Sequence, residues 1–405
     1  MLRRRHLVLA IGTCGQAATC IYSYGLASLV PRMRVEWHLS LARTGLVVSA
    51  PVLGLLATLV AWGIAADRLG ERRVLVVGLL GAGLTLCAAP LVGSAAGTGF
   101  LLGVAGAFGA SVNAASGRVV LAWFAPAERG TAMGVRQSAQ PLGVALGGAL
   151  LPTLAAHHGI GAALLFPAAL CLASALGVAL FVTDPPAAAR AAGEGSGRGD
   201  EGSPYADGML VRVHLASALL VVPQFVTGAF AVAFLVDSFG WADVSAGRLL
   251  AVVALAGAAG RIAVGRWSDR VGSRLGPLRT VAVTTAAAAG LLCLGAATGV
   301  EVLAVAALAA ATTVSSMPNG LAFTAVAEKA GRAWAGRALG LQNTGQNATA
   351  VLVPPVFGAL VGTAGFTAAF AVATLAPVLA ALAVPVAAEH PQGRPVPGGS
   401  PTTRT

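Results

Sequence analysis

Twelve stretches of mostly apolar residues run through this chain of 405 residues, and the charged residues cluster between them. At a rise of 1.5 Å per residue, a helix needs about 20 apolar residues to cross the hydrocarbon core of a bilayer. Each stretch is long enough, so the sequence predicts about twelve membrane-spanning helices. They cover residues 7–30, 44–66, 74–92, 97–123, 131–156, 160–183, 209–236, 245–265, 280–299, 302–327, 337–362 and 365–388.

The composition supports an all-α membrane protein in a lipid bilayer. Hydrophobic residues make up 57% of the chain and charged residues 10%, and the mean hydropathy is +0.81. The core of a soluble protein does not need so hydrophobic a composition. The 53 glycines suit helices that pack closely in lipid, where no hydrophobic force drives helices together. The formal charge of +11 lies at predicted helix ends, so a nucleic-acid partner is not expected.

The basic residues are divided unequally between the two sets of predicted loops. With the N-terminus placed in the cytoplasm, the opposite side holds only Arg32, Arg34, Arg43 and Arg248. The positive-inside rule therefore predicts a multi-pass protein of the plasma (inner) membrane with both termini cytoplasmic. The apolar segment after Met-Leu-Arg-Arg-Arg could be a signal peptide, but its length and the lack of a clear cleavage site favour a first spanning helix.

One motif follows the second apolar stretch and returns after the eighth. The first copy reads Gly-Ile-Ala-Ala-Asp-Arg-Leu-Gly-Glu-Arg-Arg from residue 63, and the second reads Gly-Arg-Trp-Ser-Asp-Arg-Val-Gly-Ser-Arg from residue 265. Each copy lies where a spanning helix leaves the bilayer and the chain must turn back, which indicates a duplicated bundle. The motif residues are Gly63, Asp67, Arg68, Gly70, Arg72 and Arg73, and then Gly265, Asp269, Arg270, Gly272 and Arg274.

This motif resembles the loop signature Gly-x-x-x-Asp-Arg-x-Gly-x-Arg-Arg of the major facilitator superfamily of secondary transporters. The first copy fits it throughout, whereas the second has Leu275 where the last basic residue would stand. The resemblance implies two pseudo-symmetric six-helix bundles and a gating role for the motif. In that role the carboxylates of Asp67 and Asp269 meet the positive N-terminus of helix 11 or 5 in the opposite half. The alternative is a simple turn and topology marker.

The two halves keep a nearly constant register. The motif aspartates are 202 positions apart, and a separation of 206 relates three further pairs, Gly134 with Gly340, Gln140 with Gln346, and Asn113 with Asn319. A parallel repeat of this kind predicts bundles at residues 1–183 and 209–388, with substrate bound where they meet. The polar segment 184–208 is predicted to be a flexible cytoplasmic linker, and the tail 389–405 to be disordered.

Polar side chains follow one face of predicted helices 5 and 11. Residues four apart share a helix face, so these groups should line a wet cavity, since each costs roughly several kcal/mol when unpaired in hydrocarbon. Arg136, about 10 Å inside the cytoplasmic end, is the predicted anion-binding group. Snorkelling to the inner surface, or pinning the loop near Asp269, are its alternatives. The candidates are Arg136, Gln137, Gln140, Gln342, Asn343 and Gln346.

Further polar residues complete the predicted substrate site if helices 1, 4, 7 and 10 line the cavity, as the resemblance implies. They are Gln16, Tyr22, Asn113, Gln224 and Asn319. Asn319 lies between Pro318 and Gly320, which is compatible with a hinge or broken segment there and equally with an interhelical hydrogen bond from Asn319. Arg118 lies nearer the cytoplasmic surface, where we expect it to snorkel or to pair with Glu128.

The absence of certain residue types and motifs from the sequence limits the functions that the chain can have. No carboxylate falls at the middle of a predicted span, so a small polar or anionic organic solute is favoured over the alternative of a proton-coupled multidrug or metabolite efflux antiporter. No phosphate-binding loop, clustered nucleophile or metal-ligand spacing is present, so neither an enzyme, a metal site nor a cofactor is expected. The expected partner is a small-molecule substrate, with a coupling proton or ion left open, and a monomer is expected. A non-transporting membrane sensor is the other alternative.

Overall fold

The computed structural model describes residues 2–39, 41–182 and 203–389. The first half of the described chain consists of α1 (Leu2–Ser23), η1 (Gly25–Leu29), α2 (Val30–Glu36), α3 (Leu41–Leu69), α4 (Glu71–Cys87), η2 (Ala89–Leu91), α5 (Ala95–Trp123), η3 (Pro126–Glu128), α6 (Arg129–Ala163) and α7 (Leu165–Phe181). The second half consists of α9 (Met209–Phe239), α10 (Asp243–Val271), α11 (Leu275–Thr298), α12 (Glu301–Ser316), α13 (Pro318–Ala383) and η4 (Val386–Ala388). No strand occurs in these three ranges.

Helix α13 is three helices in one. Gly331 (φ 64°) and Gly365 (φ 80°) interrupt it with a positive φ, which glycine adopts without the steric cost of a Cβ. The first piece continues α12 into one apolar span, Glu301–Gly331. The other two pieces belong to the apolar segment Ala333–Ala388, whose 56 residues are enough to cross a bilayer twice.

The described residues contain twelve crossings. Ten helical segments are long and apolar enough to span a membrane, and Leu165–Phe181 is a shorter apolar helix of 17 residues. The last of the ten segments crosses twice because it folds back at Gly365. This confirms the predicted all-α membrane fold with about twelve spanning helices.

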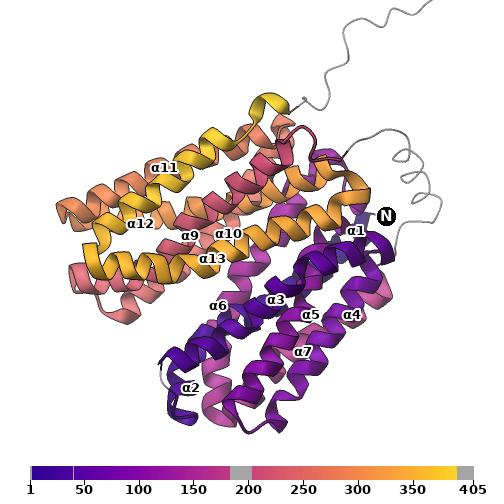
Figure 1. The fold of residues 1–405 in the computed structure, drawn as a ribbon, viewed down its shortest axis with the longest axis horizontal. Coiled ribbons are helices and arrows are strands. Elements are labelled where there is room, and N and C mark those ends of the chain that lie inside the picture. The colour runs from indigo at the N-terminus through magenta and orange to yellow at the C-terminus, as the bar shows by residue number, and fades with distance from the viewer. Residues whose placement is uncertain (1, 40, 183–202, 390–405) are drawn as a thin grey trace, which may run out of the picture.

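The crossings form two bundles, α1–α7 and α9–α13, which appear in indigo to magenta and in pinkish red to yellow in Figure 1. Each bundle has its own buried apolar core, with Leu79, Leu86 and Leu102 in the first and Leu308 and Phe370 in the second. Large apolar side chains also cover the outside of the bundles; they include Phe100, Val302 and Leu382, which are 71%, 80% and 69% exposed. Such a surface is costly in water and favourable against lipid chains.

The two bundles converge at the end where the N-terminus lies and diverge toward the other end (Figure 1). At the converging end Arg5 of α1 pairs with Glu128 of η3 at 2.6 Å. We call this end of the molecule, which holds Asp67, Gly130, Asp269 and Gly336, the latch end, and the opposite end the far end.

The predicted linker and tail fall mainly outside the described residues. Of the segment 184–208 only 203–208 is described, and of the tail 389–405 only Glu389. In the described part of the linker, Asp207 forms an ion pair with Lys329, and the Tyr205 hydroxyl lies 3.2 Å from His214 Nε2. This end of the linker is therefore attached to the second bundle. The boundaries of the two predicted domains stay predictions.

Candidate functional site

The carboxylate of Asp67, at the end of α3, binds the helical segment that follows Gly331 in α13. Its Oδ1 accepts a hydrogen bond from the Gly336 backbone N–H (2.9 Å), and its Oδ2 accepts one from the Arg337 N–H (3.1 Å). The Asp67 side chain is only 3% exposed and forms an ion pair with Arg118 of α5. A carboxylate near a helix N-terminus is stabilised by the helix dipole. Because Asp67 belongs to the first bundle and Gly336 to the second, this contact joins the two bundles. We call it the first latch.

Arg118 does not pair with Glu128, contrary to our expectation. Its guanidinium pairs with Asp67 and, at 2.7 Å, with Glu71 of α4. Glu128 lies in η3, beyond the end of α5, and its carboxylate forms an ion pair with Arg5 instead. The turn between α3 and α4 places two carboxylates against the side of α5.

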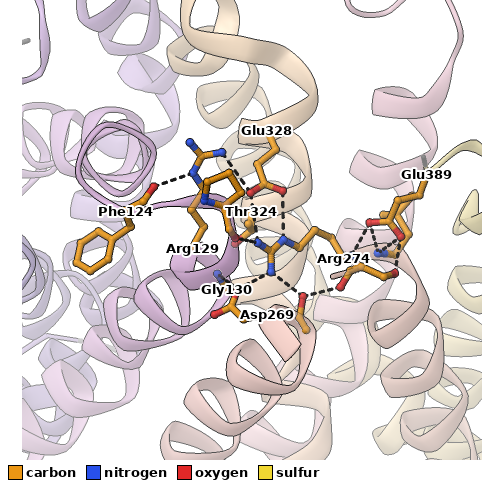
Figure 2. Close-up of polar contacts among 12 residues, drawn as sticks. Phe124, Arg129, Gly130, Asp269, Arg274, Thr324, Glu328 and Glu389 are labelled. Carbon is orange, nitrogen blue, oxygen red and sulfur yellow. Dashed lines mark hydrogen bonds and ion pairs between the residues drawn. The ribbon is translucent and has the colours of Figure 1, made fainter. Parts of the chain in front are cut away.

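Asp269, at the end of α10, makes the equivalent contact with the beginning of α6 (Figure 2). Its Oδ1 accepts a hydrogen bond from the Gly130 N–H (2.8 Å), and its Oδ2 accepts bonds from the N–H and hydroxyl of Thr131 (both 2.7 Å). Arg274 binds Asp269 at 2.6 Å and Glu328 of α13 at 3.1 Å. Burial works to lower the pKa of the Arg274 guanidinium, but Glu328 and Asp269 raise it above its usual value, so Arg274 stays charged. We call this contact the second latch.

The departure from the motif at Leu275 coincides with the start of α11. Leu275 is fully buried in the core of the second bundle, and its N–H donates to the carboxylate of Glu389 at 3.1 Å. Glu389 also accepts bonds from the Arg274 N–H and the Ser273 hydroxyl (Figure 2). A basic side chain at this position would have to leave that core, which accounts for leucine here.

Glycines allow the helices to touch at both latches. A Cβ built on Gly63 would lie 2.5 Å from the carbonyl oxygen of Gly336. A Cβ built on Gly265 would lie 2.2 Å from the carbonyl oxygen of Gly130. The neighbouring atoms are backbone atoms that no rotamer change can move, so each contact requires glycine.

The other motif residues have different environments. Gly70 (φ 87°) and Gly272 (φ 68°) form the turn after α3 and α10, where a positive φ reverses the chain. The remaining motif arginines are exposed at the latch end, and they are Arg68, Arg72, Arg73 and Arg270. Of these, Arg72 donates a hydrogen bond of 2.5 Å to the carbonyl oxygen of Ala179 at the end of α7.

Most of the predicted polar residues meet in one small chamber between the bundles. Gln16 donates to the Asn113 side chain at 2.7 Å, and Asn343 donates to the Asn113 carbonyl oxygen at 3.3 Å. On the other side Gln346 donates to Asn319 at 3.1 Å, and Asn319 to Gln224 at 3.4 Å. The chamber encloses about 40 Å³, and the predicted residues that line it are Gln16, Asn113, Gln137, Gln140, Gln224, Asn319, Asn343 and Gln346.

Three predicted site residues do not line this chamber. Tyr22 points into the core of the first bundle, where its hydroxyl donates to the carbonyl oxygen of Ala105 (3.0 Å). Gln342 is buried on another face of α13 against His214. Arg136 lies directly behind the chamber. Residues i and i+1 on a helix point about 100° apart, which is why neighbours of lining residues are themselves hidden.

Arg136 is 1% exposed and is held by neutral groups. Its guanidinium donates to Ser116 Oγ (2.6 Å), Gln137 Oε1 (2.8 Å) and Gln16 Oε1 (3.3 Å). The Phe323 ring lies 5.6 Å from its central carbon. No carboxylate pairs with it among the described residues. Its positive charge therefore reaches the chamber through the side chains of Gln16 and Gln137.

Sequence reasoning missed Arg261 and Tyr24. Arg261 of α10 is 2% exposed, so it is a second deeply buried charge beside the predicted Arg136. Its guanidinium donates to the carbonyl oxygens of Ser316 (2.8 Å) and Gln137. Arg261 lies four residues inside the end of the predicted span 245–265, and a charged residue inside a span could have identified it as a candidate site residue. Tyr24 follows the predicted Tyr22 by two residues and donates to Asn347 at 2.5 Å.

A second, larger cavity of about 580 Å³ adjoins the polar chamber. It shares Tyr24, Gln140, Gln224 and Phe225 with the chamber and includes Arg261 in its lining. Within the described parts of the chain, no group of three or more His, Cys, Asp or Glu side chains could hold a metal ion. All five cysteines are free.

Two helical bundles, latched together at one end and enclosing a polar chamber between them, define a membrane transport protein built on a parallel repeat. The described geometry has a closed end and a cavity on the interface, as a carrier requires. The chain belongs to the Major Facilitator Superfamily, whose family model matches residues 12–354. This family consists of transporters, which agrees with the prediction that the chain is not an enzyme.

Relatives and solved structures agree with this assignment. The chain is 40% identical over 383 residues to the uncharacterized MFS-type transporter Rv2994 of Mycobacterium tuberculosis, covering 94% of this chain and 84% of the relative. Its fold is similar to that of the human organic anion transporter MFSD10 (TETRAN), with a TM-score of 0.74, 17% identity, and 94% and 99% of the two chains covered. It is also similar to the proton:xylose symporter XylE, with a TM-score of 0.76, 15% identity, and 94% and 95% covered.

Proposed function

We propose that this transporter carries a polar or anionic organic solute by secondary active transport with alternating access. The two bundles rock about the chamber, and the latches hold the latch end closed while the far end is open. One observation carries the choice of an anion. Two buried guanidinium groups, Arg136 and Arg261, flank Gln137, and neither has a carboxylate partner among the residues that the structure describes. Buried positive charge without a counter-ion favours an anionic ligand.

In this proposal Arg136 is a positioning residue. It orients Gln16 and Gln137 by hydrogen bonds at 3.3 and 2.8 Å, and those amides line the polar chamber that adjoins the larger cavity. The amide pairs Gln16–Asn113 and Gln346–Asn319 lie on opposite bundles, so one solute bonded to both would link the two halves.

The orientation in the membrane is part of the proposal. The positive-inside distribution supports an orientation in the inner membrane with both termini and the latch end facing the cytoplasm. The protein acts as a monomer in this proposal. The described conformation is then open toward the outside.

Two alternatives make different predictions. A proton-coupled multidrug or metabolite antiporter would move cationic compounds, for which two buried arginines are unfavourable. A non-transporting sensor would bind a solute without moving it across a vesicle membrane. The similar fold of the proton:xylose symporter XylE supports including a pH gradient in the assay, so that proton coupling is tested directly.

Replacing Arg136 by glutamine should lower the uptake of organic anions into proteoliposomes at least about tenfold. Removing a charge-assisted hydrogen bond costs about 1.5–3 kcal/mol, and Gln16 and Gln137 would lose their fixed orientation. The assay screens labelled organic anions, sugars and cationic drugs under imposed pH and potential gradients. Arg136→Lys should retain part of the activity because it keeps the charge.

Arg34→Gln is the matched control for this experiment, since Arg34 lies exposed on α2 away from the chamber. It should transport at the parent rate. Anion uptake at full rate in Arg136→Gln would remove the proposed role of Arg136, and uptake of cationic drugs alone would favour the antiporter.

A further inference from the structure

The larger cavity has a polar and an apolar part. Its polar lining consists of Tyr24, Gln140, Gln224, Arg261, Thr312 and Ser316. The rest of the lining comes from small or apolar residues of α6, α9 and α10, among them Val144, Gly228, Leu250 and Ala251. The cavity holds about 580 Å³ of space, against about 40 Å³ in the polar chamber next to it.

These two parts are separated along the helices. On α6 the order from the latch end is Gln140, Pro141, Val144, and on α9 it is Gln224, Phe225, Gly228. On α10, which runs in the opposite direction, Arg261 is nearest the latch end and Gly247 is farthest from it. These last two positions are 14 residues apart, or about 21 Å at 1.5 Å per residue. The cavity is therefore polar at its inner end and apolar for the remaining length toward the far end.

The charge at the inner end is not neutralised by the protein. The Arg261 guanidinium uses Nε to bind the Ser316 carbonyl oxygen (2.8 Å) and Nη1 to bind that of Gln137. The hydrogen bonds of Arg261 to described residues use Nε and Nη1 and leave Nη2 free to meet a ligand, and no described carboxylate pairs with Arg261. Guanidinium binds carboxylate, phosphate or sulfonate oxygens in a planar, charge-assisted geometry.

From this arrangement we infer that the solute is an amphipathic organic anion, whose charged group binds Arg261 and whose apolar body occupies the cavity between α6, α9 and α10. This inference rests on the proposed function and specifies its substrate class. A wholly polar solute would leave the apolar walls wet, and a cation would face a buried guanidinium. An anion with an apolar body satisfies both ends of the cavity.

Alkanesulfonates test this inference because their charge is permanent, so they do not cross a bilayer by protonation. The purified full-length protein is placed in lipid nanodiscs, and binding of sulfonates of two to twelve carbons is measured against empty nanodiscs. Affinity should rise by up to about fourfold for each methylene buried, until the cavity is filled. Alkyltrimethylammonium ions of equal length should not bind.

Arg261→Gln should weaken decanesulfonate binding at least about tenfold, and Arg261→Lys should weaken it less. Arg248→Gln is the matched control, because Arg248 is exposed on the same helix and does not line the cavity. Equal binding of decanesulfonate by Arg261→Gln and the parent protein would overturn the inference.

A second variant leaves Arg261 and its bonds intact. Ala251→Trp fills the apolar part, so it should abolish the gain in affinity with chain length while leaving ethanesulfonate binding unchanged. Ala256→Trp, at an exposed position of α10 outside the cavity lining, should behave like the parent. An unchanged chain-length series in Ala251→Trp would overturn the inference.

The same proteins in liposomes separate this inference from the proposed function. Uptake of short polar anions, without dependence on chain length or on Ala251→Trp, would overturn the amphipathic substrate and leave transport standing. Length-dependent binding without uptake of any solute under any gradient would overturn secondary transport and support the site.

Discussion

Gly134→Leu should prevent the latch end from closing. A Cβ at residue 134 of α6 would lie 2.5 Å from the Arg261 carbonyl oxygen of α10, in the opposite bundle. Neither backbone can move without separating the bundles, and such overpacking costs about 1–3 kcal/mol or more. A cost of about 2 kcal/mol lowers the ratio of closed to open molecules about thirtyfold, since each 1.4 kcal/mol is a factor of ten in an equilibrium constant.

The closed population can be measured without knowing the substrate. Nitroxide labels on Ala127→Cys and Arg266→Cys, both exposed at the latch end on opposite bundles, report the separation by pulsed electron spin resonance. The exposed Cys14 is replaced by serine beforehand. Gly148→Leu in the same helix is the control, because nothing lies within 4 Å of a Cβ there. A short label distance in Gly134→Leu, equal to that of the control, would contradict the close-packing argument.

Asp269→Asn should raise the ratio of molecules open at the latch end to molecules closed there about ten- to a hundredfold. The carboxylate accepts bonds from Gly130 and Thr131 and pairs with Arg274, and its side chain is only 6% exposed. An amide carries no charge to attract the helix N-terminus and presents one acceptor oxygen in place of two. Losing charge-assisted bonds of this kind costs about 1.5–3 kcal/mol.

The same label pair measures this change, and Asp237→Asn, an exposed position on α9, is the control. Asp67→Asn should act in the same direction, because Asp67 binds Gly336 and Arg337 in the same way. Both aspartate variants giving the parent distance distribution would mean that the latches do not hold this end closed, and the motif would be only a turn.

The two latches differ in how their carboxylates are supported. The first is backed by Arg118, which also binds Glu71 at 2.7 Å within the first bundle. The second is backed by Arg274, which also binds Glu328, and Glu328 in turn reaches Arg129 of the first bundle at 3.5 Å. Each latch therefore includes one ionic contact between the bundles. In the first, Arg337 pairs with Asp67 at 3.3 Å, and in the second, Arg129 pairs with Glu328, as Figure 2 shows.

The number and class of the helices followed from the sequence, because bilayer insertion depends on the length and apolarity of each segment on its own. Every predicted span corresponds to a helical segment of the structure. The repeat could also be predicted from the sequence, since pairs of like residues such as Gln140 and Gln346 are separated by the same number of positions. Local information was sufficient for these features.

The site depended on which helix faces meet, and only the tertiary structure decided that. Tyr22 and Tyr24 are equally plausible in the sequence, but one packs in a core and the other lines the chamber. The sequence places Arg261 near the end of a predicted span. In the structure α6 and α10 cross in close contact through glycines such as Gly134, and this crossing buries Arg261. Burial and ion pairing arise between segments distant in the chain, so the apolar runs and the motif could specify the bundles but not the side chains that face one another across them.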